Sequence, residues 1–114
     1  MHVFITGASG WIGSAVVDDL LVSGHAVSGL ARSDASAAAL EGKGVAVRRG
    51  DLDDLDAIRS GARDADAVIH LANKHDWSDM AGTNAAERAT TQTIGDALVD
   101  TGKPFLLALS LIHI

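Results

Sequence analysis

The sequence contains no cysteine, no tyrosine and a single proline among its 114 residues. Without cysteine, the chain can form neither disulfide bonds nor thiolate metal sites. The lack of tyrosine removes one general acid from its possible chemistry. No apolar run reaches the roughly 18 residues of a membrane span. The first residues also lack the basic start and long apolar core of a signal peptide. We therefore expect a cytoplasmic protein with no membrane partner.

Positive charge is scarce as well. Nine Lys and Arg residues stand against 15 Asp and Glu residues, which gives a formal net charge of −6. An acidic chain of this kind does not have the overall field that attracts nucleic acid or anionic membranes. Hydrophobic residues make up 47% of the sequence, which is enough for one domain with one modest core.

Short apolar runs alternate with helical patterns along the whole chain. Apolar, β-branched runs followed by helices are typical of a parallel sheet covered on both faces. Right-handed crossovers then favour an α/β Rossmann-type fold, a doubly wound parallel sheet of five strands in the order 3-2-1-4-5. The predicted domain covers residues 1–108. The predicted strands are 2–6, 25–31, 45–48, 66–71 and 105–108, and the predicted helices are 11–23, 34–41, 54–63 and 80–101.

The first strand runs into the glycine-rich stretch FITGASGWIGSAV, residues 4–16. One glycine there permits a tight turn, another lets backbone approach a pyrophosphate, and a third lets the following helix pack against the strand. The helix N-terminus then faces the phosphates with its free N–H groups. The alternative is an ordinary turn between strand and helix. The stretch predicts a dinucleotide site with the candidate residues Gly7, Ser9, Gly10, Trp11, Ile12 and Gly13.

Four segments in order, TGASGWIG, GLARS, GDLDD and DAVIHLAN, resemble the NAD-dependent epimerase/dehydratase family. This family comprises the extended and atypical short-chain dehydrogenase/reductases. The resemblance implies the NAD(P)-binding half of a reductase, epimerase or dehydratase that uses hydride transfer on a small carbonyl or sugar-like substrate. A noncatalytic module of the same fold, which senses NADP or binds a partner, is the alternative.

The end of the second strand bears on the choice between NAD and NADP. An acidic residue there suits the ribose hydroxyls of NAD, whereas an arginine suits the 2′-phosphate of NADP. This strand ends in Arg32 and Ser33, which favours NADP over NAD. The alternative is that Arg32 is a solvated charge paired with Asp34.

Two further segments carry candidates that come from the resemblance. In GDLDD, Asp51 would accept a hydrogen bond from the adenine amine and Leu52 would pack against the ring, although an aspartate here can also cap a helix. In HLAN, the family pattern places Leu71, Ala72 and Asn73 along the nicotinamide-side ribose, although ordinary strand-end packing explains the first two equally well.

A metal site is not predicted. His70, His75 and Asp76 are close in sequence, but His70 lies on a strand and the other two lie on a loop with no set geometry relative to it.

The catalytic Y-x-x-x-K pair of the family is missing, because the chain has no tyrosine. Ser110 is the candidate for the family's catalytic serine. The apolar tail LSLIHI, residues 109–114, departs from the family pattern, and we expect it to be foreign to the parent gene. The chain is therefore expected to be an N-terminal fragment without turnover. We also expect it to self-associate through an open sheet edge.

Overall fold

A computed structural model describes residues 1–8, 11–50, 54–71, 80–99 and 101–107 of the chain. Strands and helices alternate in it as the sequence pattern predicts. The elements are β1 His2–Thr6, α1 Trp11–Val22, β2 Ala26–Ala31, α2 Asp34–Gly42, β3 Ala46–Arg49, α3 Leu55–Asp64, β4 Ala67–His70, α4 Met80–Leu98 and β5 Phe105–Leu107.

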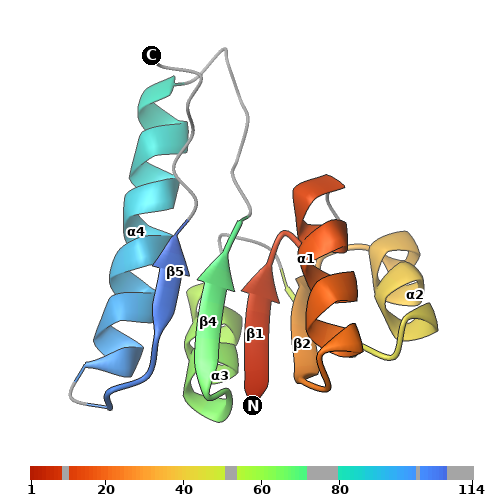
Figure 1. The fold of residues 1–114 in the computed structure, drawn as a ribbon. Helices are drawn as coiled ribbons and strands as arrows, with labels where there is room; N and C mark the ends of the chain where they lie inside the picture. The colour runs from red at the N-terminus through yellow and green to blue at the C-terminus, as the bar shows by residue number, and fades with distance from the viewer. Residues whose placement is uncertain (9–10, 51–53, 72–79, 100, 108–114) are drawn as a thin grey trace.

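The five strands form one parallel sheet in the order β3-β2-β1-β4-β5, which confirms the predicted topology. Figure 1 shows β2, β1, β4 and β5 side by side in this order. In its register, Val3 of β1 pairs with Val27 of β2 on one side and with Ala67 of β4 on the other. The chain winds outward from β1 to β3 and then returns to place β4 on the opposite side of β1. The direction of winding therefore reverses between β1 and β4, where sheets of this kind bind ligands at their carboxyl edge.

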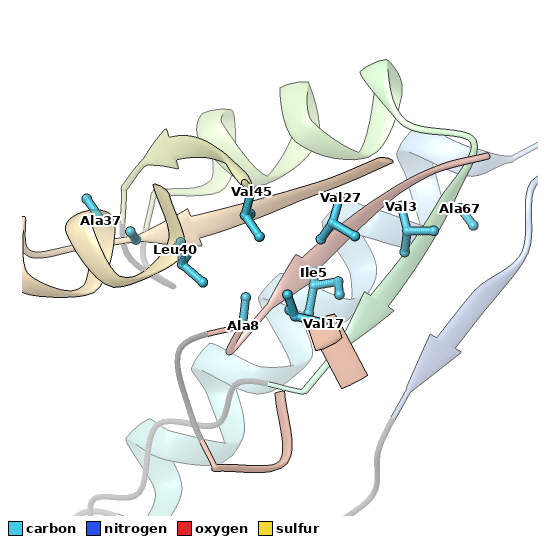
Figure 2. Packing of buried hydrophobic residues seen from close by; sticks show 10 residues of the cluster. Val3, Ile5, Ala8, Val17, Val27, Ala37, Leu40, Val45 and Ala67 are labelled. Atoms are coloured by element: carbon cyan, nitrogen blue, oxygen red, sulfur yellow. The ribbon is translucent and has the colours of Figure 1, made fainter. Parts of the chain in front are cut away.

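Each face of the sheet has its own apolar core. Because neighbouring residues of a strand point to opposite faces, Val3 and Ile5 belong to one cluster and Phe4 to the other. The first cluster packs under α1 and α2 and includes Val17, as Figure 2 shows. The second lies under α3 and α4 and includes Ile58. The helices thus hold β1 from both sides, which fixes the strand that leads into the glycine turn.

Strand β3 begins one residue later than predicted. The N–H of Val45 donates to the carbonyl of Leu40 at 3.1 Å, so Val45 closes the end of α2 and does not join the sheet. At its other end β3 extends to Arg49, which pairs in register with Ala31 of β2.

Helix α4 ends at Leu98, three residues before the predicted end. The N–H of Thr101 and its hydroxyl both donate to the Leu98 carbonyl, at 3.1 and 2.6 Å, and so end the helix. Helix α3 begins at Leu55, one residue later than predicted, because Asp54 is its N-cap and accepts from the N–H of Ala57 at 3.2 Å.

At the edge of the sheet opposite the strand ends, Asp66 connects β1 to the start of β4. The N–H of His2 donates to the Asp66 carboxylate at 2.8 Å, and the N–H of Asp66 donates to the His2 carbonyl at 2.7 Å. The first of these hydrogen bonds is the main reason that the pKa of Asp66 lies below its usual value of 3.8.

Candidate dinucleotide-binding site

The carboxyl ends of β1 and β4 lie side by side at the point where the winding reverses. Thr6 and His70 end these strands, pair in register and are both buried. The Thr6 hydroxyl is hydrogen-bonded to Nδ1 of His70, and the N–H of Leu71 donates to the Thr6 carbonyl at 3.1 Å. These contacts hold the two strand ends in a fixed relation directly below the glycine turn.

The turn after β1 begins with Gly7, whose φ of 75° lies in the left-handed region that glycine favours. The next residue, Ala8, turns back into the core and is 1% exposed. It lies against Gly29 of β2, where an added Cβ would come within 3.0 Å of the Ala8 Cβ. The glycine in the second strand therefore makes room for the turn after the first.

Gly13 provides the close approach between α1 and the turn. A Cβ on Gly13 would lie 2.7 Å from the carbonyl carbon of Gly7 and would overlap its oxygen. The first turn of α1 can therefore lie this close to the backbone of Gly7 only because position 13 has no side chain. This is the packing role that the spacing of the glycines predicts for the third of them.

The remaining candidates of the turn are placed in part. Trp11 is the first residue of α1, and Ile12 in the same turn is 68% exposed. The other candidates lie outside the described residues, as does the predicted tail at 109–114; they are Ser9, Gly10, Asp51, Leu52, Ala72, Asn73 and Ser110. Leu71 is described, and it follows β4 as a half-buried residue.

Ser33 has a structural role at the end of β2. Its hydroxyl oxygen accepts from the N–H of Ser36 at 3.1 Å, and the N–H of Ser33 donates to the Ser36 hydroxyl at 3.3 Å. This reciprocal pair is a capping box that starts α2. Ser33 is thus held in place at the carboxyl edge of the sheet.

The pairing of Asp34 with Arg32 is wrong, whereas the alternative that Arg32 is a solvated charge at the strand end stays a prediction. The carboxylate of Asp34 is bound by Arg49, with 2.9 Å between Asp34 Oδ1 and Arg49 Nη1. The guanidinium of Arg32 makes no hydrogen bond or ion pair within the described part of the chain, and the residue is exposed. Arg32 is therefore available to a ligand from solution.

Two residues of this edge were not among the sequence candidates. Thr6 and Arg49 are the last residues of β1 and β3, and their positions follow once the strand order is known. A parallel sheet with β3 beside β2 brings the end of β3 next to Arg32. The basic residue at the end of the third strand was therefore the sequence signal that could have identified Arg49. That signal does not predict that Arg49 pairs with Asp34.

A metal site was not predicted at this edge. Among the described residues, no group of three or more His, Asp or Glu side chains could hold a metal ion. His75 and Asp76 lie outside those residues.

The comparison with protein families decides which kind of dinucleotide fold this is. The model of the NAD dependent epimerase/dehydratase family matches residues 3–110. The chain belongs to the NAD-dependent epimerase/dehydratase family. The glycine turn, the strand order and the reversal between β1 and β4 are therefore parts of an NAD-binding fold of this family.

Individual proteins similar to this chain cover most of its length. An uncharacterized protein of Saccharomyces cerevisiae is 46% identical over 108 residues, which are 93% of this chain and 36% of that protein. The 2-alkyl-3-oxoalkanoate reductase of Shewanella oneidensis is 35% identical over 79 residues, or 68% of this chain and 20% of the reductase. A short-chain dehydrogenase/reductase superfamily protein from Agrobacterium tumefaciens, solved with bound NAD, has a TM-score of 0.77 at 27% identity; the match covers 96% of this chain and 33% of that one.

The chain thus spans 36% of the length of each of two curated fungal relatives. Its relatives include a reductase and a decarboxylating dehydrogenase. Within the described ranges, no helix is long and apolar enough to cross a bilayer.

Proposed function

We propose that the chain binds a nicotinamide dinucleotide above the ends of β1 and β4. It would serve as the cofactor half of an enzyme that transfers hydride to or from a small carbonyl or sugar-like substrate. The observation that carries this proposal is the contact between Gly13 and the backbone of Gly7. It brings the first turn of α1 to the strand end, where the positive end of the helix can face a pyrophosphate.

The proposed cofactor is NADP, with NAD as the weaker ligand. A free arginine at the end of β2 suits the 2′-phosphate, because a guanidinium makes charge-assisted hydrogen bonds to phosphate oxygens. Arg32 is exposed there, and its guanidinium has no hydrogen-bond or ion-pair partner among the residues that the structure describes. The acidic neighbour that would oppose a phosphate, Asp34, already has a cationic partner in Arg49. Ser33 would add its hydroxyl beside Arg32.

The family pattern extends the proposal to the two ends of the cofactor. Asp51 and Leu52 would hold the adenine, as a hydrogen-bond acceptor and an apolar contact. Leu71, Ala72 and Asn73 would line the nicotinamide-side ribose. Of these, Leu71 is anchored to the end of β1 through its N–H, which supports a place beside the glycine turn.

The catalytic acid of the proposed enzyme would lie in a part that corresponds to the region of the relatives outside their match to this chain. Delivering a proton to the developing alkoxide typically contributes a factor of about 10²–10⁴ to the rate. The family pattern assigns this step to a tyrosine, which these 114 residues lack. Ser110 remains the candidate for the accompanying serine. The second candidate function is a noncatalytic module of the same fold that senses NADP or binds a partner. A Y-x-x-x-K pair further along the parent reading frame would decide for the enzyme.

We also infer that the 114-residue chain self-associates through β5. This strand is the edge of the described sheet beside β4, and Leu106 on it is 62% exposed. An exposed apolar edge strand offers unpaired backbone groups to another copy. Sedimentation should show dimers or larger species, and Leu106→Lys should shift them toward monomer. A monomeric wild-type chain would contradict this inference.

Titration calorimetry with NAD and NADP tests the central proposal. Gly10→Val places a branched side chain where the phosphates should approach the backbone, so affinity for both cofactors should fall to the detection limit. Circular dichroism serves as the control that the variant is folded. A folded Gly10→Val chain with wild-type affinity would refute dinucleotide binding at this turn.

A further inference from the structure

Arg49 lies at a junction of three elements at the carboxyl edge. It ends β3 in register with Ala31 of β2, and the N–H of Gly50 donates to the Ala31 carbonyl at 3.0 Å. Its guanidinium reaches Asp34 at the start of α2 at 2.9 Å and the carbonyl oxygen of Arg32 at 3.5 Å. Two arginines and one carboxylate are thus gathered where β2, β3 and α2 meet.

The ion pair between Arg49 and Asp34 contributes little to folding. The Asp34 side chain is 99% exposed and that of Arg49 is 53% exposed. Pairs this exposed are worth about 0–1 kcal/mol, because water and salt screen them. What the pair changes is the local charge. Without Arg49, an aspartate two positions from Arg32 would face any anion that Arg32 binds.

The guanidinium of Arg49 also has donors to spare. A guanidinium carries more N–H groups than its contacts with Asp34 and the Arg32 carbonyl use. It can therefore keep Asp34 on one side and offer a second side to a phosphate. Because β3 pairs with β2, the backbone of Arg49 is fixed next to the end of β2, within side-chain reach of Arg32.

We propose that Arg49 is a second specificity-determining residue for the 2′-phosphate, which it binds together with Arg32 while it masks the charge of Asp34. This inference rests on the proposed binding of NADP. The sequence attributes the preference for NADP to residues at the end of β2. The proposal adds a residue at the end of β3 to them. It also makes Asp34 a conditional residue, repulsive toward the phosphate only when Arg49 is absent.

The test uses the full 114-residue chain and two small probes, adenosine 2′,5′-bisphosphate and AMP, which differ only in the 2′-phosphate. Calorimetry should show that Arg49→Gln weakens the bisphosphate by at least about tenfold and leaves AMP within about twofold. The matched control is Arg59→Gln, which breaks an exposed pair of the same kind with Asp56 on α3, at 2.7 Å. It should change neither affinity. An equal bisphosphate-to-AMP ratio in wild type and Arg49→Gln would overturn the inference.

A double-mutant cycle then separates direct binding from masking. Asp34→Asn alone should leave the affinity for the bisphosphate within about twofold, because Arg49 already masks the charge of Asp34. Added to Arg49→Gln, it should restore part of the lost affinity. Full restoration to the wild-type value would overturn direct contact between Arg49 and the phosphate, and no restoration would overturn masking.

Different results would refute the proposed role of Arg49 and the proposed binding of a dinucleotide. If the wild-type chain binds AMP and NAD, but Arg49→Gln prefers the bisphosphate to AMP as strongly as wild type does, this inference is refuted and dinucleotide binding still stands. A wild-type chain that binds none of these nucleotides refutes the proposed function, and the role of Arg49 falls with it.

Discussion

Replacing Gly13 by alanine tests the geometry of the glycine turn, and the chain supplies its own reference in Gly95. Both glycines lie inside helices, α1 and α4. Alanine is favoured over glycine in a helix by about 1 kcal/mol. Helix propensity by itself therefore predicts the same stabilisation at both positions, and any difference reports tertiary contacts.

The two sites differ in what a new Cβ would meet. At Gly95 the new Cβ would meet no atom within 4 Å among the described residues outside the adjoining helix backbone. At Gly13 the Cβ would lie 2.7 Å from the carbonyl carbon of Gly7 and still nearer its oxygen. The obstacle is backbone, so no side-chain rotation can relieve it. Overpacking of this kind costs about 1–3 kcal/mol, and more where the backbone must move.

We therefore expect opposite signs for the same substitution. Gly95→Ala should raise the free energy of unfolding by about 0.5–1 kcal/mol. Gly13→Ala should lower it by about 2 kcal/mol, because an overpacking cost at the upper end of the range, about 3 kcal/mol, exceeds the propensity gain of about 1 kcal/mol. In reversible thermal unfolding, this corresponds to melting temperatures about 4 °C apart for each kcal/mol.

Binding gives a second readout on the same pair of variants. Gly13→Ala must displace the Gly7 turn, so NADP should bind at least about tenfold more weakly. Gly95→Ala should leave the dissociation constant unchanged. If Gly13→Ala stabilises the chain as Gly95→Ala does and binds NADP normally, α1 does not approach the turn as described.

Three further outcomes are expected. Arg32→Ala should weaken NADP by about 1.5–3 kcal/mol more than NAD in calorimetry, since a charge-assisted contact to the 2′-phosphate is lost; equal weakening would show that Arg32 does not read the phosphate. The 114-residue chain should oxidise no NADPH with a panel of aldehydes and ketones, and turnover abolished by His70→Gln would contradict this. The pKa of Asp66 is lowered in the folded chain by the His2 N–H, so its stabilising effect is complete above about pH 4 and is lost as the pH falls below that value. In Asp66→Asn, the free energy of unfolding measured with urea should therefore fall less steeply as the pH drops below about 4. An unchanged pH dependence would argue against that hydrogen bond.

Most of the architecture could be predicted from the sequence because the underlying signals are local. Apolar runs that alternate with helical patterns specify parallel strands with crossovers, and right-handed connections leave few strand orders. The three glycines at positions 7, 10 and 13 predict both a turn and a packed helix start. The element boundaries were less certain, because they depend on single hydrogen bonds. One example is the Val45 N–H that closes α2 on Leu40.

The pairing of charges at the carboxyl edge of the sheet was decided only by the tertiary structure. Arg32 and Asp34 are two residues apart in sequence, and sequence proximity suggested that they pair. The register between β2 and β3 instead brings Arg49 to Asp34, and Arg32 remains open to solution. The sequence determined that a basic residue follows the second strand. Which carboxylate neutralises which cation depends on the strand beside it, because a side chain reaches only what the fold places within a few ångströms of it.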